Sequence, residues 1–279
     1  MKNLIRFGFR KFKKILPRNF KVNLKKELLE ERQIGREPVF PFGQFRAWIE
    51  TKTFEANKIC AHEFDLLGSG QQKLGKNINW EEPWPGSRKD PKYAWELSRF
   101  QFLGSLIAAF ELQKDEKYAT EARDLIHDWI LKNPSGKGIN WQVPMEAAIR
   151  ASNFAMAYYF LRETATWKDK KWSRKFLTSI AEHGKFIAAN LEYHYPANTN
   201  HLIADGASLL FLGILFPQFK DARKWKAKGI AIFEKEMTDQ VYDDGVHGEA
   251  SIPYHRLVCE FFGLAALLCK LNDVPLSHA

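Results

Sequence analysis

Apolar helices recur along this 279-residue chain at a nearly constant interval. The spacing of apolar side chains predicts them at about 91–113, 143–163, 200–216 and 252–271, so their starts lie about 50 to 57 residues apart. A more charged helix follows each of the first three, near 118–129, 169–190 and 218–237. Because a helix that is apolar on nearly all sides is buried, we expect the recurring helices to form an inner series with the charged partners outside. Repeated two-helix units of this kind predict an all-α fold, an incomplete (α/α) toroid.

The rest of the chain adds few structural signals. Segments 20–33 and 44–64 are also expected to be helical, and strand signals are scarce, with no Asn-Gly or Asp-Gly hairpin between alternating runs. The apolar run at residues 206–216, which Ser208 alone interrupts, is shorter than the roughly 20 residues that span a bilayer. Three scattered cysteines without a C-x-x-C pair indicate neither a disulfide framework nor a zinc site.

The positive charge is concentrated at the N-terminus. The first 20 residues hold seven basic side chains and no acid, so the remaining 259 carry only +2 of the net +9. A nearly neutral body does not favour nucleic-acid binding. Residues 1–16 place apolar side chains opposite the basic ones, which predicts a helix either on an anionic membrane surface or docked on the protein itself. We therefore divide the chain into a basic amphipathic helix with linker, 1–40, and a toroid domain, 41–279.

Polar and aromatic loops precede the recurring helices, at residues 79–84, 138–142, 193–201 and 243–255. A toroid places the starts of its inner helices at one end, and loops on a rigid scaffold commonly carry function. The four loops are therefore expected to meet at one rim and to line a cleft.

Asn200 and Tyr254 are separated by one helical-pair period and begin two of the inner helices. An amide at a helix N-terminus can donate to a carboxylate, although Asn there is also a common helix cap. Tyr254 follows Pro253 and can act as a general acid or base if its pKa is lowered, or it can simply pack into the rim. His201 and His247 can assist, although a single histidine more often has a structural role.

Two further groups have both a structural and a functional interpretation. Glu146 and Arg150 are four residues apart on a helix, which is consistent with an ion pair or with Arg150 meeting an acidic substrate. Trp80 and Trp141 can be core aromatics or platforms for sugar rings. The histidines and Glu249 show no H-x-x-x-H or H-E-x-x-H spacing, so we expect no metal and no cofactor.

At these residues the sequence resembles the heparinase II/III-like family of polysaccharide lyases. The resemblance covers roughly residues 75–275 and rests on three stretches, Asn140-Trp141 running on to Glu146-Ala147-Ala148-Ile149-Arg150, Asn198-Thr199-Asn200-His201-Leu202, and Asp244-Gly245-Val246-His247-Gly248-Glu249 followed by Ser251, Tyr254, His255 and Arg256. The family fold is an N-terminal (α/α) toroid followed by an antiparallel β-sandwich domain.

The resemblance implies β-elimination on uronic-acid polysaccharides, such as glycosaminoglycans or alginate-like polymers. By position, Asn200 matches the amide that neutralises the uronate carboxylate, aided by His201, and Tyr254 matches the tyrosine that takes the C5 proton or protonates the leaving 4-oxygen. The positions expected to bind substrate are Trp80, Asn140, Trp141, Glu146, Arg150, His247, Glu249 and His255.

The family's remaining catalytic histidine belongs to the β-sandwich half, which is absent from this chain. We therefore expect a fragment that binds its polysaccharide but cleaves it poorly if at all. No signal peptide is recognisable, which favours a cytoplasmic or peripheral-membrane location, while the resemblance also allows a periplasmic one.

Two other functions remain open. An (α/α)-toroid glycosidase would need two carboxylates about 5–9.5 Å apart, from among Asp205, Asp243, Asp244 and Glu249. A non-catalytic carbohydrate-binding protein of polysaccharide production, held at a membrane by residues 1–16, would bind sugar without turnover.

Overall fold

The fold is mostly helical, and the computed structural model describes residues 22–28, 37–41, 53–194 and 196–277. The expected helix over residues 1–16 lies outside these ranges, so that helix, its membrane contact and the division near residue 40 remain predictions. The elements in chain order are α2 (Leu24–Glu27), α4 (Thr53–Cys60), β1 (Glu63–Asp65), β2 (Gln71–Lys73), the 3₁₀ turn η2 (Ser87–Lys89), α5 (Pro91–Ser98), α6 (Leu103–Gln113), α7 (Glu116–Lys132), the 3₁₀ turn η3 (Ile139–Trp141), α8 (Pro144–Leu161), α9 (Lys170–Ala189), α10 (Asn200–Leu215), α11 (Ala222–Gln240) and α12 (Ile252–Leu271).

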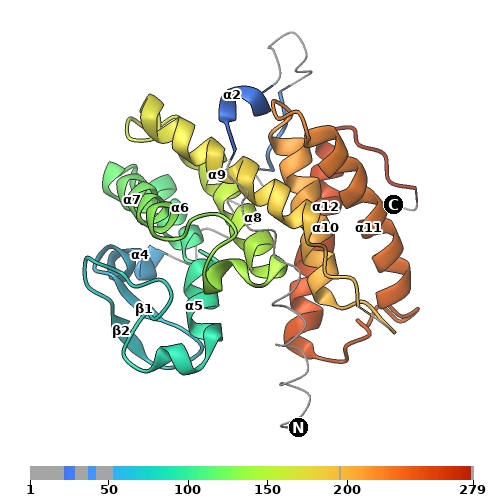
Figure 1. Cartoon of the computed structure of the whole chain (residues 1–279), viewed down its shortest axis with the longest axis horizontal. Coiled ribbons are helices and arrows are strands. Elements are labelled where there is room, and N and C mark those ends of the chain that lie inside the picture. Colours follow the sequence, from blue (N-terminus) through green and yellow to red (C-terminus); the bar gives the residue numbers. More distant parts are fainter. Residues whose placement is uncertain (1–21, 29–36, 42–52, 195, 278–279) are drawn as a thin grey trace.

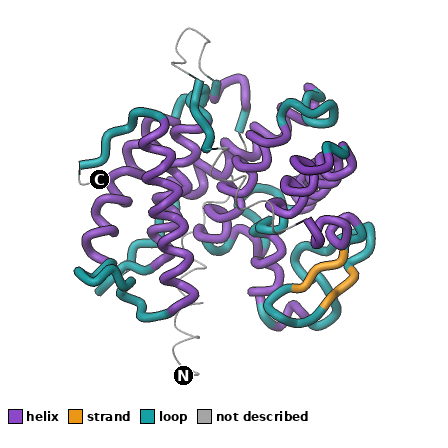
Figure 2. The backbone as a smooth tube through the Cα atoms, turned by 180° about the vertical axis from the view of Figure 1, so that it is seen from behind, coloured by secondary structure: helices purple, strands orange, loops and turns teal. Residues whose placement is uncertain are grey.

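The helices pack as a series of two-helix units, as the interval in the sequence predicts. Helix α6 contacts α8, α8 contacts α10 and α10 contacts α12, which is the order expected of an inner layer. Figure 1 shows the α6–α7 pair on one side of the molecule and α10, α11 and α12 on the other, and Figure 2 shows the same arrangement from behind. This confirms the all-α toroid portion.

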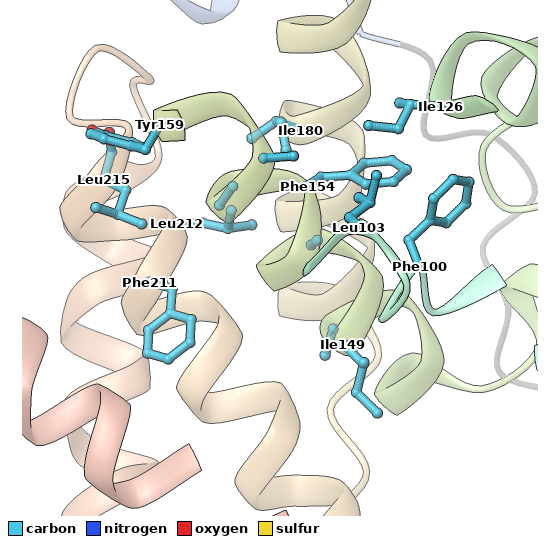
Figure 3. Close-up of a cluster of buried hydrophobic side chains, with 14 of the residues drawn as sticks. Phe100, Leu103, Ile126, Ile149, Phe154, Tyr159, Ile180, Phe211, Leu212 and Leu215 are labelled. Atoms are coloured by element: carbon cyan, nitrogen blue, oxygen red, sulfur yellow. The ribbon is translucent and has the colours of Figure 1, made fainter. Parts of the chain in front are cut away.

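Burial distinguishes the inner helices from their partners. Every residue of α10 except His201 is buried, and most of α8 is buried as well. Their side chains meet those of α6 and α9 in one apolar core that includes Phe154, Leu212 and Leu215 (Figure 3). Since burying one such side chain stabilises the fold by roughly 1.5–3 kcal/mol, this core fixes the position of the α8 and α10 N-termini.

Helix α12 buries only one side, and Ile252 at its start is 86% exposed. By length and composition alone it could cross a membrane, but the core helix of a globular protein passes the same test.

The backbones of α10 and α11 approach closely at small residues. A Cβ added to Gly213 would lie 2.5 Å from the backbone nitrogen of Lys226, and one added to Gly229 would lie 2.6 Å from that of Leu210. Only glycine allows this approach, because any side chain would overlap backbone that cannot move away. This packing fixes the first half of α11 against α10, and the Gln240 side chain, which donates to the Thr199 carbonyl at 3.2 Å, holds the end of α11 beside Asn200.

The helix expected over residues 91–113 is broken. It divides into α5 and α6 because Phe100 has a φ of 60°, in the left-handed region. Its ring is completely buried and stacks on Trp80, with edge contacts to Trp129 and Phe154. Aromatic packing therefore outweighs helix continuity here, and the break leaves Arg99 at the end of α5.

The expected helix over residues 44–64 is wrong at its end. Only Thr53–Cys60 is helical in the described part, and an antiparallel hairpin of β1 and β2 follows. Its turn contains Gly68 and Gly70, both with positive φ, rather than the Asn-Gly or Asp-Gly pair sought in the sequence.

Candidate active site

Asn200 is the first residue of α10, and its donors already hold a carboxylate. Glu249 Oε1 accepts from the backbone nitrogen of Asn200 at 2.6 Å and from Nδ2 at 2.8 Å, and Oε2 lies 3.0 Å from Nδ2. The helix cap is Thr199, whose side chain accepts from the backbone N–H of His201. Asn200 is therefore not the cap, and its amide contacts an anion, the task expected of it at a helix N-terminus. Asn200 is only 2% exposed.

Glu249 is supplied by the loop between α11 and α12. The loop is closed by an antiparallel bridge between Val241 and His247 and by a bond from the Gly248 nitrogen to the Gln240 carbonyl, 2.7 Å. Ala250, next to Glu249, has a φ of 50°, which is unfavourable for a residue with a Cβ. The loop therefore has a defined shape that aims Glu249 at α10.

His201 is the residue of α10 that reaches the surface, with 31% of its side chain exposed. Its Nδ1 lies 3.0 Å from Glu192 Oε1. Burial alone would lower the pKa of His201, but the hydrogen bond to Glu192 and the charges of Glu192, Glu146 and Glu249 together raise it. The surrounding carboxylates thus favour the protonated form of this imidazole, whose charge would favour an anion next to it.

Glu192 is a buried residue that braces this region. Its Oε2 accepts from the backbone nitrogen of Met145 at 2.8 Å, which ties the start of α8 to the loop before α10. Its own backbone nitrogen donates to Asp205 Oδ2 at 3.0 Å. Burial and the nearby charge of Glu192 raise the pKa of Asp205 well above its ordinary value.

Tyr254 and His255 lie in the first turn of α12, after the helix start that Pro253 favours. The Tyr254 side chain is accessible, with the residue 46% exposed. His255 Nδ1 accepts from the His247 backbone nitrogen at 3.4 Å, in the loop that also carries Glu249. The loop that carries Glu249 thus connects the α10 and α12 N-termini. Figure 1 shows both helices starting in the lower right part of the picture.

Glu146 does not pair with Arg150, as the four-residue spacing suggested. Instead Arg99 Nε and Nη2 donate to the two Glu146 oxygens at 2.7 and 2.8 Å, and Arg99 also pairs with Glu96. Burial would lower the pKa of Arg99, but these two carboxylates raise it above its usual value. Glu146 is only 2% exposed, so it orients Arg99 rather than presenting its own charge to a ligand.

Arg150 is fully buried, which corrects its expected contact with substrate. Its Nε donates to His183 Nε2 at 2.9 Å, and its guanidinium carbon lies 4.1 Å from the Trp129 ring centre and 5.0 Å from that of Trp141. Burial lowers the pKa of Arg150 to about 9, so it stays charged at neutral pH, stabilised by two aromatic faces. The Trp141 ring is buried in this packing and therefore offers no face to a sugar.

Three other predicted substrate contacts are also interior residues. Trp80 is 1% exposed and donates from its ring nitrogen to Asp128, 2.8 Å. Asn140 is inaccessible and donates to the Trp80 carbonyl and to Asn133 Oδ1, both at 2.9 Å. His247 is 1% exposed and pairs with the Gln240 side chain, and burial lowers its pKa. They hold the rim loops in shape, because their polar atoms and rings are engaged inside the protein.

The rim loop before α5 borders an open pocket of about 370 Å³. It is lined by Asn77, Ile78, Asn79, Trp80, Glu81, Lys132 and Asn133. The amine of Lys132 is occupied by Asn77, the Ile78 carbonyl and Asp128. The accessible imidazole and phenol instead lie at the starts of α10 and α12, which we therefore regard as the candidate active site.

Comparison with known proteins agrees with this geometry. Residues 36–275, which include every residue of the candidate site, match the family described as Heparinase II/III N-terminus. The chain belongs to this family. The heparinase II/III chain is 30% identical over 243 residues to a heparin-sulfate lyase of Pedobacter heparinus, covering 83% of this chain and 36% of that protein. It is 31% identical over 207 residues to a heparin-sulfate lyase of Bacteroides thetaiotaomicron, covering 72% and 28%.

Solved structures of the family share the fold. A crystal structure of the heparan sulfate lyase HepC from Pedobacter heparinus superposes with a TM-score of 0.65 at 26% identity, over 98% of this chain and 40% of that one. A crystal structure of a heparinase III gives a TM-score of 0.69 at 22% identity, over 94% and 39%. The heparinase II/III chain thus spans between 28% and 40% of the length of these relatives.

Arg99 and Glu192 are the functional candidates that the sequence interpretation missed. Arg99 lies inside an expected continuous helix, and only the break at Phe100 turns it toward Glu146. Glu192 precedes the singled-out loop by one residue and carries no motif. The one signal in the sequence was its position, three residues beyond the end of α9 and shortly before Asn200.

Proposed function

We propose that this chain forms the substrate-binding toroid of a polysaccharide lyase that acts by β-elimination on uronic-acid-containing polysaccharide. The observation that supports this most directly is the carboxylate held at the start of α10. Glu249 accepts three contacts from Asn200, so the geometry for receiving a carboxylate is already formed. A uronate that displaced Glu249 would find the same donors and the positive end of the α10 dipole.

The chemistry needs the uronate carboxylate neutralised before the C5 proton is acidic enough to leave. Asn200, aided by His201, would neutralise it, and both would also stabilise the enolate-like charge that develops as the C5–H bond breaks. Tyr254, accessible at the neighbouring helix start, would take that proton or protonate the 4-oxygen as the C4–O4 bond breaks and the C4=C5 double bond forms. Arg99, fixed by Glu146, adds a partly exposed guanidinium for an acidic sugar.

Because the curated relatives are heparin-sulfate lyases, heparan sulfate is the first substrate to test. A hydrolase of the same fold is less well supported. Asp205 is completely buried, and Glu249 is engaged with Asn200.

The test is an elimination assay that follows the ultraviolet absorbance of the unsaturated uronate. The 279-residue chain is incubated with heparan sulfate alone and with the separately produced C-terminal part of the Pedobacter heparinus lyase. We expect unsaturated product when the C-terminal part is supplied. This product should disappear in Tyr254→Phe and persist in Tyr242→Phe, a control that alters an exposed tyrosine of the preceding loop. Cleavage that yields no double bond would indicate hydrolysis, and sugar binding without cleavage under both conditions would indicate a binding protein.

A further inference from the structure

Three potential metal ligands meet at the loop before α10. Glu192, His194 and His201 each offer one ligand atom, and these atoms lie within 4.8 Å of one another. Glu192 Oε1 and His201 Nδ1 are 3.0 Å apart, close to the separation of two ligands on one zinc ion, and the two imidazole ring centres are 6.2 Å apart. We propose that these three side chains bind a single divalent transition-metal ion, with zinc the best match.

The ligand chemistry favours a transition metal over calcium or magnesium. Two imidazoles and one carboxylate form a set that three-ligand zinc sites use, with a further position left for water. Calcium and magnesium prefer sites made wholly of oxygen. His194 is exposed and His201 partly exposed, so an ion can enter from solvent without opening the core.

The ligands are held by further hydrogen bonds, as metal ligands commonly are. Glu192 has its second oxygen fixed by the Met145 backbone nitrogen. The backbone nitrogen of His194 donates to Asn198 Oδ1 at 3.0 Å, and Asn198 in turn donates to Glu236 at 2.8 Å. These bonds orient the carboxylate and restrict the loop that carries His194.

The local charge provides a second, independent argument. Glu192 and Asp205 are both buried, and their backbone-to-carboxylate contact places the two acids side by side. Asp205 Oδ1 has no hydrogen-bond partner among the described residues. A divalent cation on Glu192 would offset the charge of this carboxylate, which is costly to bury even when Asp205 keeps its proton.

This site was not expected from the sequence, because its ligands fit no helical spacing. The metal site does not depend on the proposed lyase function, because ion binding can be measured on the chain itself. In the described part of the molecule, it is the one group of three or more such side chains close enough to share an ion.

The experiment is a calorimetric titration of the metal-free 279-residue chain with zinc chloride. Wild type should bind one ion saturably, and His194→Ala should weaken binding by at least about tenfold. Because His194 is exposed, this variant should keep the wild-type unfolding temperature. The matched control is His62→Ala, which removes another His–Glu pair, 2.9 Å apart, and should leave zinc binding unchanged.

A second readout identifies the ligands. X-ray absorption of the zinc-loaded chain should show two imidazoles, reduced to one in His194→Ala. The proposal is overturned if wild type shows no saturable one-to-one binding, if His194→Ala binds zinc as tightly as wild type, or if the spectrum contains no imidazole.

Discussion

The side-chain amide of Asn200 donates to both carboxylate oxygens of Glu249, at 2.8 and 3.0 Å. The residue expected to neutralise a substrate carboxylate is thus covered by a carboxylate of the protein itself. Binding of a uronate at Asn200 requires Glu249 to move away, because two carboxylates cannot share one amide without repulsion. Under the proposed function Glu249 would therefore compete with the substrate, while its direct contact with sugar, expected from the sequence, stays a prediction.

Replacing Glu249 by Gln should strengthen the binding of a heparan sulfate oligosaccharide, by up to about tenfold, which corresponds to about 1.4 kcal/mol. The variant keeps an oxygen that can accept from the Asn200 backbone but loses the competing charge. The measurement is calorimetric titration at fixed ionic strength. Glu260→Gln, with the same charge change on the exposed side of α12, should have little effect. Weaker binding in Glu249→Gln would instead mean that Glu249 contacts the sugar.

Replacing Glu192 by Gln should lower the pKa of His201, because the charge and the hydrogen bond that raise it are weakened. A raised histidine pKa stabilises the fold below the ordinary histidine pKa, and this contribution is lost as pH rises through the raised value. The unfolding-temperature difference between wild type and variant should therefore shrink as pH rises. Nuclear magnetic resonance titration of the imidazole reports the pKa directly.

The matched control for that titration is Glu121→Gln. Glu121 raises the pKa of His62 chiefly through its hydrogen bond. This variant should lower the pKa of His62 and leave His201 unchanged. An unaltered His201 pKa in Glu192→Gln would contradict the assignment of Glu192.

Replacing Asp205 by Asn should flatten the fall of stability with rising pH. Burial, with the charge of Glu192, holds the pKa of Asp205 above its ordinary value, so the native state keeps a proton that the unfolded state has released. Stability then decreases as pH rises from the ordinary aspartate range, by at most about 1.4 kcal/mol per pH unit. Asn carries no such proton, so thermal unfolding at several pH values should show the variant gaining on wild type as pH rises. A constant difference would contradict this.

Gly213→Ala should destabilise the protein by about 1–3 kcal/mol, because its Cβ would overlap the backbone of α11. Gly263→Ala is the matched control on α12, where an added Cβ meets nothing within 4 Å. The control should be neutral or stabilising by up to about 1 kcal/mol, as alanine is the better helix former. Urea unfolding of both variants measures these changes. Equal effects would show that α10 and α11 do not depend on close backbone approach.

The sequence predicted the helices well, because their core-facing apolar residues alone determine the pattern. The fully buried α10 and its amphipathic partner α11 are examples. The helix prediction from the sequence failed where packing between distant residues outweighs the local pattern of apolar residues. The break at Phe100 depends on rings from α7, α8 and the loop at Trp80, none of which is near it in the chain.

The site was predictable in part for the same reason. The sequence placed Asn200 and Tyr254 at helix starts correctly because the repeat interval predicts where these helices begin, while their catalytic role stays a prediction. The burial of Arg150 and Trp141 was not predicted. The sequence pattern of a buried guanidinium between aromatic rings is the same as that of a surface cation beside an aromatic sugar-binding residue. Ion-pair partners, such as Arg99 for Glu146, depend on distances in the folded protein, which the spacing of residues in the sequence does not give.

A crystal structure of the chain with a bound heparan sulfate oligosaccharide would test the central claim most directly. We predict a uronate carboxylate within hydrogen-bonding distance of Asn200 Nδ2 and His201, with Glu249 turned away and the Tyr254 hydroxyl facing C5 of that sugar. An oligosaccharide bound elsewhere while Glu249 remains on Asn200 would contradict it.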